Sequence, residues 1–348
     1  MVTIGVDPHK QTHSAAAING VGQEQGRCTE PGVRSGFEAM VRWARKLDQE
    51  RLWVIEDCRH VSGPLERFLL DRGETVLRLP PHLIAGARRS ARQPGKSDPI
   101  DALAIARAAL REGAETLPTA RLGGIELEIR LLTVHRERLV TSRTRLINEL
   151  RWHLHDLWPD WEIRERGLIH PTLQQQVSRR LKRADPTVRV RIARDLIARV
   201  RELTVTVNQL QHELGDLVHA AAPQLLAERG LGVLIAAKLI GEIGDVTRFQ
   251  SDAQLARLAG CAPIPVSSGR TDRYRLDRGG NRHLNHAIHL LAVSKAIHDP
   301  NTAIYIAKQR QNGKTHRDAI RCLKRHLVRR IWRLLTDPAH TSQTICLT

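Results

Sequence analysis

The sequence predicts a mixed α/β domain at the N-terminus, a long helical coiled-coil middle and a mainly α-helical C-terminal domain. Up to about residue 124, short apolar runs typical of strands alternate with helical patterns. A leucine repeat then indicates long paired helices, and shorter helices separated by Gly- and Pro-containing loops follow. We therefore expect domains at residues 1–124, 125–220 and 221–336, and a loose tail at 337–348.

The first predicted strand ends in an acid. Val2, Ile4 and Val6 alternate as in a buried strand, and Asp7 stands at its end. Residues 13–18 form a second apolar run at hairpin distance. An acid at such a strand end is a candidate metal ligand, although helix caps and turns also use Asp at this position.

Another apolar strand, residues 52–55, also ends in an acid. Glu56 follows it directly, and Asp57 stands beside Glu56. The other elements of this domain are predicted as helices at 36–47 and 62–71 and a strand at 75–79.

Two more acids open the next predicted helix, at 98–111. Asp98 and Asp101 lie three residues apart, which places both carboxylates on one helical face. Either acid alone is explained as a helix cap or a partner of the helix dipole. Together with the two strand-end acids, however, they could hold two divalent cations that stabilise the attacking and leaving oxygens of a phosphodiester.

The charge of the chain indicates a polyanionic partner. Its 348 residues carry a formal net charge of +18, and 41% hydrophobic content indicates a globular protein. Residues 1–124 hold 18 Lys and Arg against 15 Asp and Glu, whereas residues 261–348 hold 16 against 5. We therefore expect the contacts to nucleic acid to lie mainly towards the C-terminus.

The five cysteines predict neither disulfides nor a zinc site, because their number is odd and no Cys-x-x-Cys occurs. The N-terminus lacks the pattern of a signal peptide, and no apolar run of membrane-spanning length is present. We expect a cytoplasmic, reduced protein with no membrane partner.

The middle region predicts two long helices. The first runs from about Glu126 to Leu157, and the second carries a heptad seam. The seam positions are Ala193, Leu196, Val200, Leu203, Val207, Leu210, Leu214 and Leu217. The two helices could pair within one chain as an ordinary buried hairpin or associate two chains. We favour a coiled-coil dimer element, because the seam is narrower than a globular helix usually needs.

Two further segments are candidates for contacts with nucleic acid. Gly230-Leu231-Gly232 lies between two predicted helices and resembles a helix–hairpin–helix motif, in which Gly230 and Gly232 would let backbone N–H groups approach a phosphate. A tight helical hairpin without a ligand explains the glycines equally well. Arg88, Arg89 and Arg92 could contact a phosphate backbone or form an ordinary solvated surface.

A proline-containing loop in the C-terminal domain carries a candidate nucleophile. Ser267-Ser268-Gly269 follows Pro263 and Pro265, and Gly279-Gly280-Asn281 then opens a helix. Five arginines surround the serines and could neutralise phosphoryl oxygens: Arg270, Arg273, Arg275, Arg278 and Arg282. Ser-Gly is itself a common loop dipeptide, so the residues alone do not assign a catalytic role.

The N-terminal acids and the C-terminal serine loop, in this order along the chain, resemble the motifs of the DEDD transposases of the IS110 family. Asp7, Glu56 and Asp98-x-x-Asp101-Ala after Gly-Lys-Ser match the family's N-terminal acids. Gly-x-x-Pro, Ser-Gly, a basic segment and Gly-Asn-Arg-x-Leu match its C-terminal domain. The resemblance covers nearly the whole chain, and the two motif sets are specific only in combination.

The resemblance implies an RNase H-like, RuvC-type N-terminal domain that holds two Mg²⁺ ions through Asp7, Glu56, Asp98 and Asp101. It also implies that Ser268 attacks the DNA phosphodiester and forms a covalent phosphoserine. Members of the family pair donor and target DNA through a bridge RNA, and they form dimers that assemble into tetramers. The acids of one subunit then meet the serine of another.

Two alternatives use the same residues differently. A RuvC-like nuclease that uses water would need the acids but not Ser268. A non-enzymatic nucleic-acid-binding protein with a degenerate fold would need neither, but the presence of all four acids argues against it. The residues themselves leave open Ser267 against Ser268 and Glu56 against Asp57, although the position directly after the strand favours Glu56.

Overall fold

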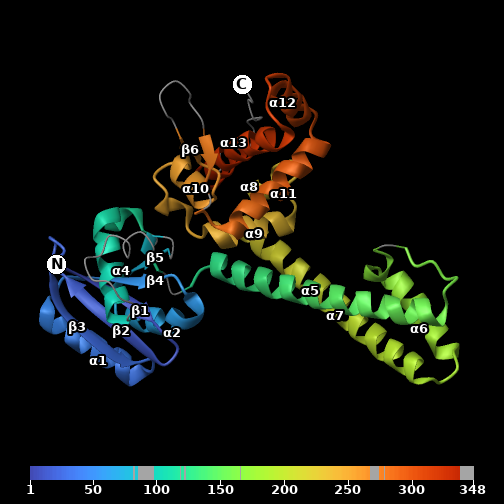
Figure 1. The fold of residues 1–348 in the computed structure, drawn as a ribbon, viewed down its shortest axis with the longest axis horizontal. Coiled ribbons are helices and arrows are strands. Elements are labelled where there is room, and N and C mark those ends of the chain that lie inside the picture. Colours follow the sequence, from blue (N-terminus) through green and yellow to red (C-terminus); the bar gives the residue numbers. More distant parts are fainter. Residues whose placement is uncertain are drawn as a thin grey trace. The chain divides into compact units, whose positions relative to one another are not determined.

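The computed structural model describes residues 1–80, 83–84, 98–117, 119–120, 123–164, 166–266, 274–277 and 279–337. These residues form two compact units (Figure 1). The first comprises Met1–Gly124 with Thr247–Gln250, and the second comprises the rest of the chain from Ile125 onward. The tail predicted at 337–348 lies, beyond residue 337, outside the described residues.

Unit 1 is built on a five-stranded mixed sheet. The strands are β1 (Val2–Pro8), β2 (Thr12–Ile18), β3 (Glu24–Pro31), β4 (Arg51–Glu56) and β5 (Thr75–Leu79). Their order is β3-β2-β1-β4-β5, in which β1, β2 and β3 pair antiparallel and β1, β4 and β5 pair parallel. The predicted mixed α/β domain is therefore confirmed.

The sequence analysis missed β3. This strand lies at one edge of the sheet, and its residues alternate between half-buried and exposed. Because no residue of β3 is fully buried, its sequence lacks the apolar alternation by which the other strands were recognised.

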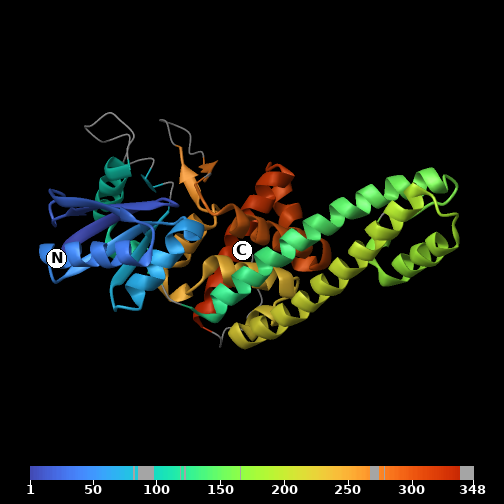
Figure 2. The ribbon, with the colours of Figure 1, turned by 90° about the horizontal axis from the view of Figure 1, so that it is seen from below.

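Helices cover both faces of this sheet. One face packs on α1 (Arg34–Leu47) and α2 (Arg59–Leu70), and the other on α4 (Asp98–Glu112). Figure 2 shows the two layers on opposite sides of the strands. Alternate residues of β4 divide between them: Trp53 and Ile55 join the core with α1 and α2, whereas Val54 joins the core with α4.

A glycine sets the distance between the sheet and α4. A Cβ atom on Gly5 of β1 would lie 2.2 Å from the carbonyl oxygen of Ala102 and 2.4 Å from the amide nitrogen of Ala106. The backbones of β1 and α4 are therefore in direct contact, which only a residue without a side chain permits. This contact brings the start of α4 close to the end of β1.

Unit 2 contains a long helical hairpin. Helix α5 (Ile125–Leu157) packs along α7 (Val188–Ala221), and α6 (Pro171–Arg183) packs on α7. The short turn η2 (Gly167–Ile169) precedes α6. Helix α6 was not predicted from the sequence. It was missed because only Gln174, Val177 and Leu181 of its residues are buried.

The heptad seam of α7 is only partly buried within one chain. The first seam row is fully buried and comprises Ala193, Val200, Val207 and Leu214. The second buried row is Val190, Ile197, Thr204 and Val218. In the other seam row Leu196 is buried, whereas Leu203, Leu210 and Leu217 are only half-buried. The helix pair thus buries a face rotated from the predicted seam, and one leucine row remains partly accessible.

The rest of unit 2 consists of shorter elements. They are α8 (Pro223–Ala227), α9 (Val233–Ile243), α10 (Asp252–Leu258), β6 (Pro263–Pro265), β7 (Tyr274–Leu276), α11 (Arg282–His298), α12 (Pro300–Gln311) and α13 (His316–Thr336). On α13 one apolar row is buried, as expected for an amphipathic helix: Ile320, Leu323, Leu327, Ile331 and Leu334. In the described part of the chain, every helix is too short or too polar to cross a membrane.

Candidate functional site

Two of the candidate acids stand side by side at the ends of β1 and β4. Strand alternation turns Gly5 and Asp7 towards α4, because Ile4 and Val6 pack on the opposite face. The parallel register pairs Val6 with Ile55, so Glu56 is the next residue along β4 beside Asp7. Asp7 is buried, with 3% of its surface exposed, and Glu56 is half-buried.

The first turn of α4 supplies the other two acids. Asp101 is buried and Asp98 is half-exposed, with 48% of its side chain accessible. Burial is the largest cause that raises the pKa of Asp7; with the opposing effect of His9 and the negative charges of Glu56, Asp101 and Asp98, the pKa is about 6. The fold therefore brings all four acids within electrostatic reach of one another.

Asp57, the alternative to Glu56, lies differently. Its backbone N–H donates a hydrogen bond to the carbonyl oxygen of Leu79, 3.0 Å away, which ties the end of β4 to the end of β5. The charge of Glu56 raises the pKa of Asp7, whereas the charge of Asp57 is not among the causes of that shift.

A histidine that the sequence analysis did not single out joins this acidic cluster. The Nε2 atom of His9 lies 2.9 Å from Oδ1 of Asp98 and 3.5 Å from Oδ2 of Asp7. The hydrogen bond to Asp98 raises the pKa of His9, and the neighbouring carboxylates add to the effect. The only signal in the sequence is that His9 follows Asp7 by two residues, a spacing that has no chemical signature of its own.

The donor atoms of this cluster fit a divalent cation. The ligand atoms of Asp7, His9 and Asp98 all lie within 4.8 Å of one another. The Oδ2 atom of Asp7 is buried and accepts no hydrogen bond from the described residues. Buried carboxylate oxygens need positive charge nearby, and Mg²⁺ and Mn²⁺ prefer such oxygen ligands. His9, when it is protonated, supplies part of that charge.

The predicted serine loop lies mostly outside the described residues. Ser267, Ser268, Arg270, Arg273 and Arg278 are among the residues that the structure leaves undescribed, as are Arg88, Arg89 and Arg92. The described neighbours are the strands β6 and β7, which pair antiparallel on either side of residues 267–273. These strands were not predicted, because each spans three residues and β6 begins and ends with proline.

The base of this hairpin is fixed on helices. Asn285 of α11 donates a hydrogen bond to the carbonyl oxygen of Ala259, 2.6 Å away, and the N–H of Asn281 donates one to Leu258, also at 2.6 Å. A Cβ atom on Gly280 would lie 2.2 Å from the amide nitrogen of Gly260. The segments that lead into and out of the loop are therefore held in close backbone contact.

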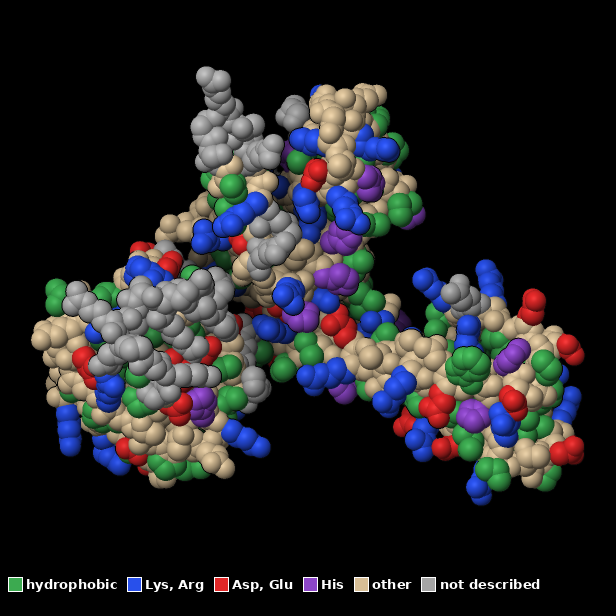
Figure 3. All heavy atoms as spheres, in the orientation of Figure 1, with side chains coloured by type: hydrophobic (Ala, Val, Ile, Leu, Met, Phe, Trp, Pro, Cys, Tyr) green, Lys and Arg blue, Asp and Glu red, His purple; other side chains and the backbone are tan. Residues whose placement is uncertain are grey.

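Basic side chains surround this hairpin. Arg275 on β7 and Arg282, the first residue of α11, are both exposed. Three exposed histidines follow at helical spacing on α11: His283, His286 and His289. In Figure 3, Lys, Arg and His side chains gather on the face of unit 2 that carries α10, α11 and α13. This face has the charge expected of a nucleic-acid interface.

The predicted glycine motif forms the connection between α8 and α9. Gly230 has a positive φ of 86°, and a Cβ atom there would lie 3.2 Å from Cγ of Lys295. Gly232 precedes the first residue of α9 and has open space beside it. Packing against α11 is thus sufficient to explain Gly230, and phosphate binding by this connection remains a prediction.

Comparisons with known proteins match both the segment that carries the acidic cluster and the segment that carries the serine loop. Residues 4–159 match a family model described as “Transposase”, of the DEDD type of IS110 elements, and residues 222–307 match one described as “Transposase IS116/IS110/IS902 family”. The chain is 26% identical over 380 residues to an uncharacterized 44.8 kDa protein of insertion element IS116 from Streptomyces clavuligerus, covering 97% of this chain and 95% of the relative.

Two further relatives come from other insertion elements. The chain is 27% identical over 390 residues to an uncharacterized 42 kDa protein of IS900 from Mycobacterium paratuberculosis, covering 97% of this chain and 96% of the relative. It is 28% identical over 388 residues to an uncharacterized 43.6 kDa protein of IS110 from Streptomyces coelicolor, covering 97% and 94%.

Proposed function

Because the chain belongs to the IS110 family of insertion-element transposases, we propose that it cleaves and exchanges strands between donor and target DNA through a phosphoserine intermediate. A transposase processes DNA, so DNA is its partner. The observation that carries the proposal is the environment of Asp7, a buried carboxylate with one oxygen that accepts no hydrogen bond from the described residues and with three further acids around it.

The acidic cluster is the proposed metal centre. Asp7, Glu56, Asp98 and Asp101 would hold Mg²⁺, in accordance with the preference of that ion for carboxylate oxygens. A divalent cation held there supplies positive charge that stabilises the attacking and leaving oxygens of a phosphodiester. The strand order β3-β2-β1-β4-β5, with helices on both faces, supports assigning this unit to the RNase H-like folds.

Ser268 is the proposed nucleophile. In this step a bond forms between the serine Oγ and the phosphorus atom, and the bond from the phosphorus to the 3′ oxygen breaks. The serine proton is lost as the bond forms, and the leaving 3′ oxygen takes up a proton. The exposed Arg275 and Arg282, which both follow the loop in the sequence, are suited to hold the phosphate oxygens.

A bridge RNA and a second subunit complete the proposal. The excess of positive charge in residues 261–348 supports an interface with nucleic acid. The half-buried row Leu203, Leu210 and Leu217 on α7 supports self-association, because these apolar side chains stay partly exposed to solvent in a single chain. Dimers that assemble into tetramers would allow the acids of one subunit to act with the serine of another.

The decisive experiment traps the intermediate. The full-length protein is incubated with a nicked suicide substrate and Mg²⁺, and protein–DNA adducts that survive denaturant are mapped by mass spectrometry. We expect the phosphate on Ser268 and loss of the adduct in Ser268→Ala, whereas Ser267→Ala retains it. Asp7→Ala and Asp101→Ala should abolish cleavage but leave the affinity for nucleic acid largely intact.

Three outcomes separate the alternatives. An adduct on Ser267 would move the nucleophile by one residue. Cleavage without any adduct, retained in Ser268→Ala, would assign the protein to the nucleases that use water. Normal cleavage by Asp7→Ala or Asp101→Ala in Mg²⁺ would refute the proposed metal centre.

A further inference from the structure

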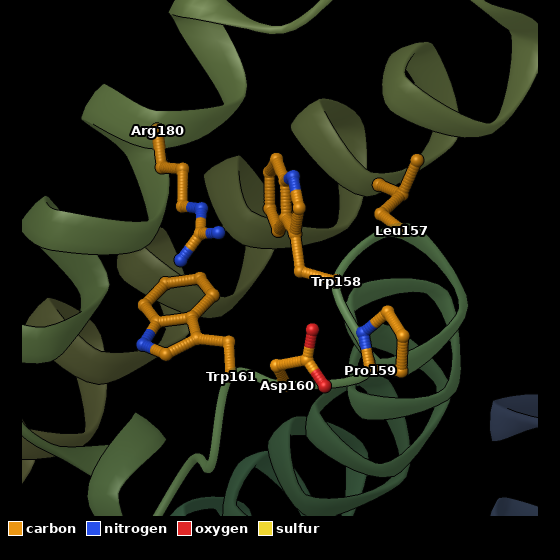
Figure 4. Close-up of a pocket in the computed structure, with 6 residues that line it drawn as sticks. All are labelled: Leu157, Trp158, Pro159, Asp160, Trp161 and Arg180. Atoms are coloured by element: carbon orange, nitrogen blue, oxygen red, sulfur yellow. The ribbon is translucent and has the colours of Figure 1, made fainter.

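A pocket lies in unit 2 where α5 ends, next to α6 (Figure 4). Its volume is about 280 Å³. It is lined by Leu157, Trp158, Pro159, Asp160, Trp161 and Arg180. Three of the six tryptophans of the chain fall within residues 152–161, although aromatic residues make up only 3% of the sequence. Among the described residues, the four acids of the proposed metal centre do not line this pocket.

The two indoles of the pocket are held in a fixed arrangement. The ring centroids of Trp158 and Trp161 lie 5.7 Å apart with an angle of 68° between the rings. Their backbone is also fixed: the backbone N–H of Trp158 donates to the carbonyl oxygen of Leu154 at 2.9 Å, and the backbone N–H of Trp161 donates to that of Trp158 at 3.0 Å. Both side chains pack partly on the core of the helical hairpin, and both remain only half-buried. Core packing therefore covers part of each indole, and both indoles also line the pocket.

Two opposite charges flank the indoles. The guanidinium of Arg180 lies 4.4 Å from the ring centre of Trp158 and 4.5 Å from that of Trp161. Asp160 is exposed, and its carboxylate points towards the same space in Figure 4. The pocket thus combines flat aromatic surfaces with the carboxylate of Asp160, which accepts hydrogen bonds, and the guanidinium of Arg180, which donates several. A planar, polar ring with a negative charge attached would satisfy all of these groups.

The surroundings of the pocket are basic. Residues 151–194 carry 10 Lys and Arg against 5 Asp and Glu. Helix α6 alone ends in four cationic residues, Arg179, Arg180, Lys182 and Arg183, all of them on or near the surface. A positive surface with exposed aromatic rings is the combination by which proteins bind single-stranded nucleic acid.

We propose that this pocket binds an unpaired nucleobase of single-stranded nucleic acid. The base stacks on the indole of Trp161 and meets Trp158 at an angle, Asp160 accepts a hydrogen bond from an N–H group on the base edge, and Arg180 contacts the adjacent phosphate. RNA and DNA share this chemistry. The inference rests on the proposed function only in that the partner is a nucleic acid, and its test does not involve DNA cleavage.

The test measures the affinity of the full-length protein for a short fluorescent oligonucleotide of mixed sequence. The same sequence is used as single-stranded RNA, as single-stranded DNA and as a duplex. Loss of one stacking partner should weaken single-strand binding roughly tenfold in Trp161→Ala. Binding of the duplex should not change, because its bases are not available for stacking.

Trp152→Ala is the matched control. Trp152 lies on α5, is 76% exposed and does not line the pocket, so its removal should leave single-strand affinity unchanged. Asp160→Asn alters an exposed residue and replaces an acceptor by an amide, so it should shift the preference among bases without changing the unfolding temperature. Trp161→Phe keeps an aromatic ring in the core contact and should retain most of the affinity, which separates stacking from a loss of folding.

The outcomes are distinct. A loss in Trp161→Ala for both RNA and DNA supports base recognition independent of the sugar, and a loss for RNA alone supports the same site with RNA as its source. Equal affinities of Trp161→Ala and Trp152→Ala would refute the proposal. An altered oligomeric state of Trp161→Ala on sedimentation, with unchanged single-strand affinity, would also refute the proposal. A second copy of the chain would then be the occupant of the pocket. If the protein does not cleave DNA but Trp161→Ala still weakens single-strand binding, the proposed function is refuted and the proposed base-binding pocket is supported.

Discussion

Replacing Asp7 by Asn should stabilise the protein when no metal is present. Burial and the neighbouring acids raise the pKa of Asp7 from 3.8 to about 6 in the folded state. The folded state therefore holds its proton more tightly than the unfolded state does. Stability is unaffected below pH 4, falls as the pH rises from about 4 to 6, and stays lower above that range.

The size of the effect follows from the pKa difference. Two units correspond to about 3 kcal/mol at pH 8, and to roughly half of that at pH 5. Asp7→Asn removes the ionised carboxylate but keeps its shape, so it should raise the free energy of unfolding at pH 8 by about 2–3 kcal/mol. At pH 4 the two proteins should be equally stable, because the carboxyl group is then largely protonated in the folded state.

The assay is urea unfolding of the full chain at pH 8 and pH 5, in EDTA and in Mg²⁺. Asp71→Asn removes an exposed acid of the same unit and serves as the control for the loss of one charge. Mg²⁺ should stabilise the wild-type protein and not Asp7→Asn, because only the former retains the ligand. If Asp7→Asn and Asp71→Asn behaved alike at pH 8 in EDTA, the acids would not form the buried cluster described here.

Three further changes test other parts of the structure. Gly5→Ala should lower the free energy of unfolding by about 1–3 kcal/mol and impair cleavage, since its Cβ would overlap the backbone of α4, whereas Gly20→Ala, which has open space, should be neutral in urea unfolding. Gly280→Ala should destabilise the hairpin that flanks the serine loop, detectable as faster hydrogen exchange in residues 258–266. Leu203→Glu combined with Leu210→Glu should give monomers in sedimentation, and an unchanged oligomer would show that the leucine row serves only packing within the chain.

The acidic cluster was predictable because its geometry is encoded locally. Strand alternation places Asp7 and Glu56 on one face, and three-residue spacing places Asp98 and Asp101 on one side of a helix. The contact between β1 and α4 that joins the two pairs was not predictable. It depends on the absence of a side chain at Gly5, and a glycine within a strand has several common explanations.

Other features failed to appear in the sequence for physical reasons. His9 enters the cluster through tertiary contacts alone, which no spacing reveals. Strand β3 and helix α6 bury too few apolar side chains to show a clear period. The seam of α7 was predicted from strict heptads, but packing against α5 uses the wider apolar face of an ordinary helix, so a different second row is buried.

The length of helix α5 also sets a distance within unit 2. This helix has 33 residues, and at 1.5 Å per residue it is about 50 Å long. It begins at Ile125, the residue after Gly124, and the tryptophan pocket lies at its C-terminal end. If the pocket binds a strand as we propose, that strand lies about one helix length from the N-terminal end of α5, which is about one and a half turns of a B-form duplex. Insertions or deletions within the paired helices should change the length of nucleic acid that the protein can span, without altering either end of the span.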